Sequence, residues 1–352
     1  MKIGITGTGS YIPPIVTKND DFLDHHFLSE DGSSFGHDNT VIIEKFKSIT
    51  GIAQRTYAKP EHNTSDLGFF ASEKAIKDAK IDKEELDYII FAHNFGDVSY
   101  GKIQGDTLPS LATRVKHRLG IKNPRCVAYD VLFGCPGWIE GVIQAQAYIK
   151  SGMAKKCLVI GAETLSRVVD QHDRDSMIYS DGAGATIIEA TTHNGEILAH
   201  ASATYANEEA YYLFFDKTYH QESCSDTRYI KMHGRKIYEF AVTHVPQALA
   251  DCLDKSGVGI DEVKKVIIHQ ANEKMDEAIV KRFYRIYGKE MPKDVMPMII
   301  QDMGNNSVAT VPTLYDMICK GALPEHRLSK GDVVIFASVG AGMNINAIVY
   351  RY

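Results

Sequence analysis

Short apolar runs of strand length alternate along the chain with longer segments of helical character. The apolar runs predict strands at residues 2–7, 88–92, 126–129, 157–160, 266–268 and 333–337. The longer segments predict helices at residues 65–79, 109–119, 136–151, 235–253, 273–286 and 308–318. Continuous apolar strands between helices are typical of α/β folds in which helices cover both faces of a sheet. We therefore expect α/β architecture, with Pro246 kinking or splitting the helix that contains it.

No linker rich in proline, glycine or serine divides the chain. We therefore expect two closely packed halves, one formed by residues 1–190 and the other by residues 191–352. Two polar segments, residues 30–39 and 96–107, are predicted to be exposed loops.

Composition narrows the possible partners and compartments. The net charge of −6 and the lack of a dense Lys/Arg run argue against a nucleic-acid partner. The first residues turn polar too early for a signal peptide, and no apolar run approaches the ~20 residues that span a membrane. The six cysteines include no CxxC pair, so we predict neither a metal site nor a redox motif. We expect a cytoplasmic protein without disulfides and without a membrane partner.

One cysteine stands where an apolar strand gives way to a turn and a helix. Cys135 precedes the helix predicted at 136–151, so free backbone N–H groups and the helix dipole favour its thiolate. A thiolate accepts an acyl group from another thioester at little thermodynamic cost. Cys126 and Cys157 instead begin apolar strands, which predicts structural roles for both. We therefore expect Cys135 to be a nucleophile.

Two further segments carry polar groups at the ends of predicted elements. His269 follows the strand at 266–268, at the carboxyl end where open α/β sheets place reactive groups. Residues 304–310 begin Gly-Asn-Asn-Ser and combine a turn with a helix cap. Either segment alone is more typical of a structural role than of a catalytic one.

Together with the Cys135 segment, these runs resemble the β-ketoacyl-acyl-carrier-protein synthase III family of the thiolase superfamily. The resemblance covers nearly the whole chain, because ten short motifs follow in the family's order. They lie at residues 7–13, 50–55, 108–110, 129–138, 163–167, 181–185, 232–235, 269–272, 304–307 and 339–342. The resemblance implies a thiolase-like layered αβαβα fold built from two similar packed halves.

The resemblance places the family's catalytic cysteine, histidine and asparagine on Cys135, His269 and Asn305. Cys135 would take the acyl group from its donor. His269 and Asn305 would donate hydrogen bonds to the thioester oxygen of the extender, malonyl in most of the family, as decarboxylation produces an enolate. The resulting carbanion would attack the acyl thioester and form a C–C bond, in fatty-acid initiation or a related lipid or polyketide pathway. No metal and no cofactor is implied.

The resemblance also implies an oxyanion site and a homodimer. The N–H of Cys135 and the turn formed by Gly340, Ala341 and Gly342 would hold the oxyanion of the acyl thioester. Leu108 stands where the family places a gate residue that faces the acyl pocket of the partner subunit. We therefore expect each site of a homodimer to need both chains.

Four further residues are implied in substrate binding. Phe133 precedes the nucleophile where small residues are usual, and its ring would narrow the acyl pocket. Arg174 matches a position that contacts coenzyme A. Lys274 and Arg235 would attract an acidic acyl carrier protein, whose phosphopantetheine arm carries the thioester.

Departures from the family pattern leave the acyl donor open. Residues 44–50 lack the tryptophan and arginine that hold the nucleotide in members using acetyl-coenzyme A. This favours, with comparable weight, a specialised condensing enzyme of secondary metabolism that takes longer or β-ketoacyl donors, as in dialkylresorcinol or cyclohexanedione formation.

Two other classes fit less well. A papain-like cysteine hydrolase has Cys, His and Asn in the same order, but its Cys-Gly-Ser-Cys-Trp signature is absent. A non-catalytic partner subunit of the thiolase fold tends to lose the nucleophile, which this chain retains.

Overall fold

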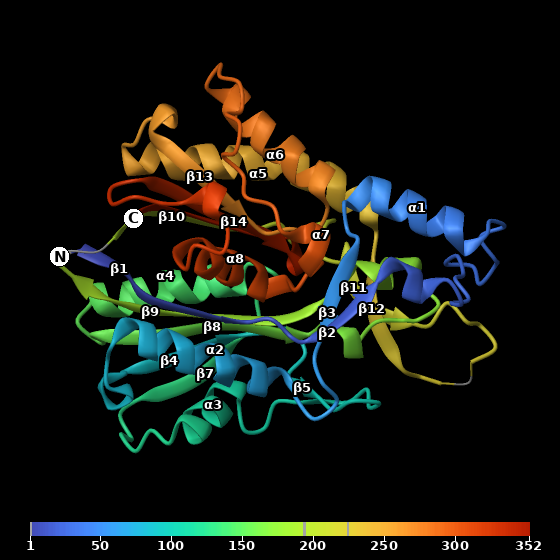
Figure 1. Ribbon diagram of the computed structural model, residues 1–352, viewed down its shortest axis with the longest axis horizontal. Helices are drawn as coiled ribbons and strands as arrows, with labels where there is room; N and C mark the ends of the chain where they lie inside the picture. Colours follow the sequence, from blue (N-terminus) through green and yellow to red (C-terminus); the bar gives the residue numbers. More distant parts are fainter. Residues whose placement is uncertain (1, 193–194, 224) are drawn as a thin grey trace.

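The computed structural model describes residues 2–192, 195–223 and 225–352. Its elements form layers in the order helix, sheet, helix, sheet, helix (Figure 1). The predicted α/β class and the αβαβα layering are confirmed. Among the described residues, no helix combines the length and the apolar character needed to cross a membrane.

The larger sheet has the strand order β1-β9-β8-β4-β7. Its strands are β1 (Lys2–Tyr11), β4 (Tyr88–Ala92), β7 (Val127–Val131), β8 (Lys156–Thr164) and β9 (Asp181–Thr191). β4 runs parallel to β7 and β8, and β9 runs antiparallel to β1 and β8. The carboxyl ends of β4, β7 and β8 therefore meet at one edge of the sheet, where open α/β sheets bind ligands.

The smaller sheet has the order β10-β15-β14-β13. Its strands are β10 (Glu196–Thr204), β13 (Val263–Ile268), β14 (Val333–Gly340) and β15 (Asn344–Arg351). Each sheet thus draws its strands from one side of the boundary expected near residue 190. The division into two domains at that residue stays a proposal, which this distribution supports.

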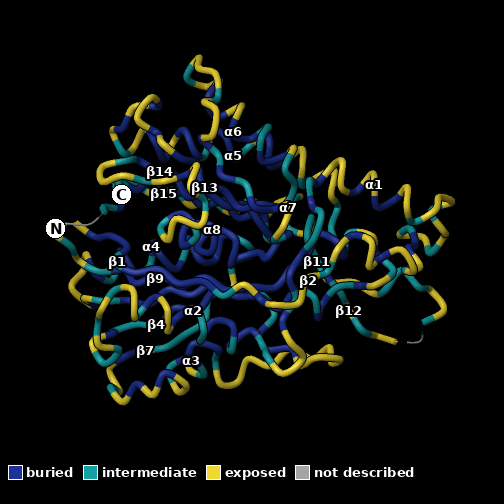
Figure 2. The backbone as a smooth tube through the Cα atoms, in the orientation of Figure 1, coloured by how far each residue is buried: buried dark blue, intermediate teal, exposed yellow. Residues whose placement is uncertain are grey.

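Helices cover both sheets and fill the space between them (Figure 1). α2 (Thr64–Ala79) and α3 (Leu111–Leu119) cover the outer face of the larger sheet, and α5 (Gly234–Ser256) and α6 (Glu273–Ile286) cover that of the smaller one. α4 (Gly137–Lys150) and α8 (Thr310–Cys319) lie between the sheets. Buried backbone follows this sandwich, and exposure concentrates in the peripheral loops (Figure 2).

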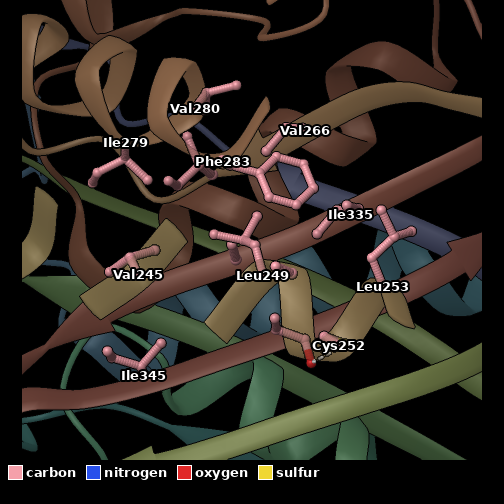
Figure 3. Packing of buried hydrophobic residues seen from close by; sticks show 14 of the residues in the cluster. Val245, Leu249, Cys252, Leu253, Val266, Ile279, Val280, Phe283, Ile335 and Ile345 are labelled. Carbon is pink, nitrogen blue, oxygen red and sulfur yellow. Dashed lines mark hydrogen bonds between the residues drawn. The ribbon is translucent and has the colours of Figure 1, made fainter. Parts of the chain in front are cut away.

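The outer core joins α5 and α6 to the smaller sheet. Side chains of both helices, including Leu249 and Phe283, meet Ile335 and Ile345 of the sheet in a continuous apolar cluster (Figure 3). Full burial of a leucine, isoleucine or phenylalanine side chain contributes about 1.5–3 kcal/mol. The cluster therefore fixes β13 and β14, whose carboxyl ends carry site residues.

The expected break at Pro246 does not divide its helix. α5 continues from Gly234 to Ser256 with Pro246 inside it. Proline has no N–H for the carbonyl of Val242, four residues earlier, which would otherwise lose its helical partner. Arg282 of α6 donates to that carbonyl at 2.8 Å. A neighbouring helix thus satisfies the group that proline leaves free.

Several elements were not predicted. They are β2 (Ile15–Lys18), β3 (Gln54–Tyr57), β5 (Asp97–Val98), β6 (Gly105–Asp106), β9, β10, β11 (Leu213–Lys217), β12 (Arg228–Met232), β15, α1 (Asn39–Thr50) and α7 (Ile300–Met303). The predicted loop at 96–107 is mostly exposed, although it holds β5 and β6. Arg114 fastens this loop by bonds to Asp97 at 2.7 Å and Asp106 at 2.8 Å.

Candidate active site

Cys135 lies in the tight turn between β7 and α4. Gly134 adopts a φ of +63°, and Pro136 is the residue before the first helical one. A Cβ atom at Gly340 would lie 2.4 Å from the backbone N of Cys135. Only glycine allows this approach, so the turn after β14 lies directly against the backbone of the nucleophile.

The thiol of Cys135 faces a cavity of about 1220 Å³. Surrounding protein raises the pKa of this thiol to about 11, chiefly by burial, and a hydrogen bond from Ser307 opposes the rise. The expected thiolate is therefore not the resting form at neutral pH. The desolvation of a buried thiol outweighs the stabilisation inferred from its place before a helix.

Access to the cavity distinguishes Cys135 from the other described cysteines. Cys126 and Cys157 are buried, as predicted, and Cys252 is buried as well. Cys319 is partly buried and does not line the cavity. Cys224 lies outside the described residues.

His269 begins the turn after β13. Its backbone N–H donates to Ala337 of β14 at 2.8 Å. The amide of Gln270 then accepts from Ile299 N–H and donates to the Pro297 carbonyl, which holds the turn in place. Burial lowers the pKa of His269 to about 4, so the imidazole is neutral at pH 7. Nδ1 of His269 has no hydrogen-bond partner in the described part of the chain.

Asn305 follows α7 in a turn that depends on Gly304. Gly304 has a φ of +61°, and a Cβ there would lie 2.9 Å from Arg55. The backbone of Asn305 pairs with Ile178 and Ser180 at 2.9 and 2.8 Å. The side-chain oxygen of Asn305 accepts from the backbone N–H of Ser307 at 2.8 Å. The amide NH2 is therefore the donor that Asn305 can offer to the cavity.

The structure brings the three predicted catalytic residues to one place. Cys135, His269 and Asn305 all line the same cavity, and Gly340 and Ala341 line it beside them, whereas Gly342 does not. They come from turns after β7, β13, α7 and β14. Neutral His269 and the amide of Asn305 are hydrogen-bond donors, and neither arrangement requires a metal. Among the described residues, no group of three or more His, Cys, Asp or Glu side chains is placed to hold a metal ion.

The outer wall of the cavity comes partly from α1, β11 and β12, which the sequence did not predict. It is formed by the loop before α1, by α1 itself, by the hairpin β11–β12 and by the start of α5. Their lining residues include Phe35, His37, Val41, Ile42, Lys45, Phe46, Ile49, Leu213, Phe214, Phe215, Ile230 and Met232. The polar segment at 30–39 thus contributes to the cavity, whereas no residue of the 96–107 loop lines it.

The other predicted site residues divide into two groups. Arg174 and Arg235 line the cavity, where Arg174 lies 4.9 Å above the ring of Phe35. Leu108, Phe133 and Lys274 do not line it.

Each of these three has a different surrounding. Leu108 is 88% exposed. Phe133 is half-buried, and its carbonyl accepts a bond from Asn344. Lys274 is exposed near the start of α6.

Sequence reasoning missed a polar chain behind the nucleophile. Ser307 Oγ lies 3.4 Å from Cys135 Sγ, and Asn94 Nδ2 donates to the same Ser307 oxygen at 3.1 Å. Asn94 also donates to the carboxylate of Glu163. Ser307 was visible two residues after Asn305 in the Gly-Asn-Asn-Ser run. Nothing local in the sequence joins Glu163 or Asn94 to it.

The layered fold and the convergence of a cysteine, a neutral histidine and an asparagine define a condensing enzyme of the thiolase superfamily. The family model described as 3-oxoacyl-[acyl-carrier-protein] synthase III matches residues 129–206, and the model of its C-terminal part matches residues 253–352. This chain belongs to the β-ketoacyl-acyl-carrier-protein synthase III family, as its motifs had indicated.

Relatives match along the whole chain. A β-ketoacyl-[acyl-carrier-protein] synthase III from Neisseria gonorrhoeae is 33% identical over 99% of this chain and 98% of its own. One from Oceanobacillus iheyensis is 31% identical over 100% and 99%. The crystal structure of the Aquifex aeolicus synthase III superposes with a TM-score of 0.81 at 31% identity, covering 99% of this chain and 100% of that one. Family membership is inconsistent with the papain-like alternative.

Proposed function

We propose that the protein condenses an acyl group held on Cys135 with a malonyl or β-ketoacyl thioester carried by an acyl carrier protein. The observation that carries this proposal is that Cys135, His269 and Asn305 line one cavity although they come from three separate turns. Family membership supports the same chemistry. Fatty-acid initiation in the cytoplasm, or a related lipid or polyketide pathway, is the setting that we propose.

In the first half-reaction, Cys135 sulfur attacks the carbonyl carbon of the donor thioester. The tetrahedral oxyanion requires donors on one side of the nucleophile. The N–H of Cys135 and the backbone of Gly340, Ala341 and Gly342 are the groups that we propose, because Gly340 lies against Cys135 N. Collapse releases the carrier thiol and leaves an acyl thioester on Cys135.

In the second half-reaction, the extender thioester enters the emptied arm of the cavity. Its carboxylate leaves as CO2, and negative charge develops on the thioester oxygen. Neutral His269 and the NH2 of Asn305 would donate to that oxygen and stabilise charge that exists only in the transition state and the enolate. The enolate carbon then attacks the acyl carbon, and Cys135 is released.

The acyl donor that we propose is longer than acetyl. The segment at 44–50, which lacks the nucleotide-binding tryptophan and arginine of acetyl-using members, lies in α1 and lines the cavity through Lys45, Phe46 and Ile49. An aliphatic and aromatic wall favours burial of an acyl chain. The same wall is compatible with the alternative of an enzyme of secondary metabolism, since that class uses longer acyl donors.

Two partners belong to the proposal. The first is a second copy of the chain, which would cover the exposed Leu108 and bring it to the acyl pocket. The second is an acidic acyl carrier protein, docked near Arg235, which lies at the cavity with an exposed side chain, and near Lys274 on α6.

A donor panel tests the proposal. The protein is incubated with acetyl-coenzyme A or with medium-chain acyl carrier protein, and then with malonyl carrier protein. We expect an acyl adduct by intact mass, fastest with the medium-chain donor, followed by a β-ketoacyl product by chromatography and mass spectrometry. Fastest acylation by acetyl-coenzyme A would contradict the proposed donor. No adduct from any donor would contradict the enzyme itself and favour a non-catalytic subunit.

A further inference from the structure

The first half-reaction poses a problem that the three catalytic residues leave unsolved. Cys135 must lose a proton to attack, yet burial raises the pKa of its thiol to about 11. His269 is a poor acceptor, because burial lowers its pKa to about 4. Tyr179, which also lines the cavity, has a pKa raised by burial and is a neutral phenol at pH 7. A proton acceptor must therefore be sought elsewhere.

A continuous polar chain leads from Cys135 into the protein. Ser307 Oγ is 3.4 Å from Cys135 Sγ. Asn94 Nδ2 donates to Ser307 Oγ at 3.1 Å and also to Oε1 of Glu163. Glu163, the penultimate residue of β8, is 1% exposed and does not line the cavity. Asn94 thus bridges Ser307 and Glu163, and the Ser307 hydroxyl also lowers the pKa of the Glu163 carboxyl.

We propose that Ser307 and Glu163 form a proton relay that takes the thiol proton of Cys135 during acylation and returns it to the departing carrier thiolate. The relay rests on the proposed function, because it serves the acyl transfer described there. Ser307 touches the reacting sulfur. Glu163 acts through Ser307, and Asn94 positions both by donating one amide proton to each.

Hydrogen-bond capacity allows this arrangement. A serine hydroxyl has one proton to donate and two lone pairs. In the structure the Ser307 hydroxyl donates to Cys135 Sγ. When the hydroxyl rotates so that its proton faces Glu163, Ser307 Oγ accepts from Asn94 and from the Cys135 S–H. As the S–C bond to the acyl carbon forms, the S–H proton passes to Ser307 and the Ser307 proton passes to Glu163. When the bond between acyl carbon and carrier sulfur breaks, Ser307 gives its proton to the leaving thiolate, which becomes a thiol, and Glu163 returns a proton to Ser307.

The surroundings of Glu163 set the pH range of this relay. Burial raises the pKa of Glu163 to about 8, Asp181 adds to the rise, and bonds from Asn94 and Ser307 oppose it. Asp181 is itself held by Ser166 and by the backbone N–H of Ala58. Glu163 therefore gains its acceptor form as the pH rises toward about 8. Acylation should increase over the same range and then level off.

A purely electrostatic role for Glu163 predicts the opposite result. The negative charge of Glu163 raises the pKa of the Cys135 thiol. If charge were its only influence, Glu163→Gln would lower that pKa and accelerate acylation. The relay instead predicts slower acylation, because glutamine cannot accept the proton. The sign of the change therefore separates the two roles.

Single-turnover acylation of Cys135 between pH 6 and pH 10 is the test, with a medium-chain acyl carrier protein as donor. We expect Glu163→Gln to lower the rate at pH 8 by about 10²-fold or more, the scale of general-base catalysis, and to remove the rise below pH 8. Ser307→Ala should do the same, and it keeps the backbone N–H that orients Asn305. Glu189→Gln, which changes an acid of β9 paired with Lys156, is the matched control and should follow the wild-type profile.

The outcomes remain distinct from one another. Acylation by the wild type with an unchanged or faster Glu163→Gln profile would overturn the relay and leave the proposed function intact. Failure of the wild type to acylate with any donor would overturn the proposed function. Should Glu163→Gln fail to fold, as judged by urea unfolding, a wild-type rate and pH profile for Ser307→Ala would overturn the relay, and a loss would support it.

Discussion

The backbone N–H of Ser307 donates to Oδ1 of Asn305 at 2.8 Å. Because this bond engages the amide oxygen of Asn305, only the amide NH2 can point toward the cavity. A substrate in the cavity therefore contacts the NH2 group and not the oxygen. The same short segment thus orients the asparagine through its backbone and reaches Cys135 through its side chain.

Removal of either cavity donor should slow decarboxylation. We expect Asn305→Ala and His269→Ala each to lower the rate of malonyl thioester decarboxylation by about 10²-fold or more, the usual cost of losing an oxyanion donor. Release of labelled CO2 measures this rate. Acylation of Cys135 by the same variants is the internal control and should change less. Normal decarboxylation by both variants would exclude the proposed roles.

The acyl group should be found on Cys135. Among the described cysteines, only Cys135 lines the cavity, so its position rather than its pKa makes it accessible to a donor. Peptide mapping after incubation with an acyl donor should place the adduct there. Cys319→Ala should acylate normally, and Cys135→Ala should not acylate. An adduct on Cys157 in the wild type would show that the nucleophile is misassigned.

Acid should destabilise the fold through His269. The pKa of His269 is about 4 in the folded protein, below the ordinary value of 6.5. Between pH 4 and pH 6.5 this histidine therefore binds more protons in the unfolded chain than in the folded one. Above pH 6.5, neutral His269 contributes about 3 kcal/mol to the free energy of unfolding. This contribution is lost as the pH falls from 6.5 through about 4.

Urea unfolding at pH 7 and pH 4.5 checks this expectation. His269→Gln, which cannot be protonated in this range, should lose about 2 kcal/mol less than the wild type between the two pH values. Equal losses in the two proteins would show that His269 is not buried as described.

The chain should form a homodimer that depends on Leu108. The Leu108 side chain is 88% exposed, and its burial against a second subunit would remove apolar surface from water. Sedimentation velocity should give a dimer for the wild type and a weaker one for Leu108→Asp. Tyr211→Asp, at a residue that is 78% exposed, is the matched control and should remain dimeric. A fully active wild-type monomer would refute this prediction.

The bond between Arg282 and Val242 should depend on Pro246. Arg282→Met leaves the Val242 carbonyl without its partner and should cost about 1 kcal/mol in the free energy of unfolding. In a Pro246→Ala background the restored N–H satisfies that carbonyl, so the same change should cost close to nothing. A double-mutant cycle in urea measures the difference. Lys281→Met, at the adjacent exposed cation, is the control; additive effects of the Arg282 and Pro246 changes would contradict this account.

Local patterns were sufficient for much of the architecture. The run Tyr88–Ala92 was predicted with its observed bounds, because a continuous apolar strand between helices has a clear signature. β9 escaped prediction because it begins with small residues, and β15 because its buried face includes Asn344 and Asn346. Such strands are defined by pairing with neighbours and by tertiary burial, which no local window contains.

The site shows the same division. Cys135, His269 and Asn305 each stand in a recognisable turn, and the order of the motifs joined them. Glu163 and Ser307 are linked only through folding, since a hydrogen bond between distant segments leaves no periodic pattern. The thiol pKa was misjudged for a related reason, because a helix start is visible in sequence and burial is not.

The separation of the site residues along the chain has a consequence for protein synthesis. When the ribosome has translated the strands of the larger sheet, Cys135 has been synthesised, but His269 and Asn305 have not. Since chains fold from the amino end as they emerge, the nascent segment holds a nucleophile without its decarboxylating partners. The turn at Gly340, which we propose for the oxyanion of the first half-reaction, also belongs to the later part of the chain. Both half-reactions therefore become possible together, once the second sheet has packed against the first.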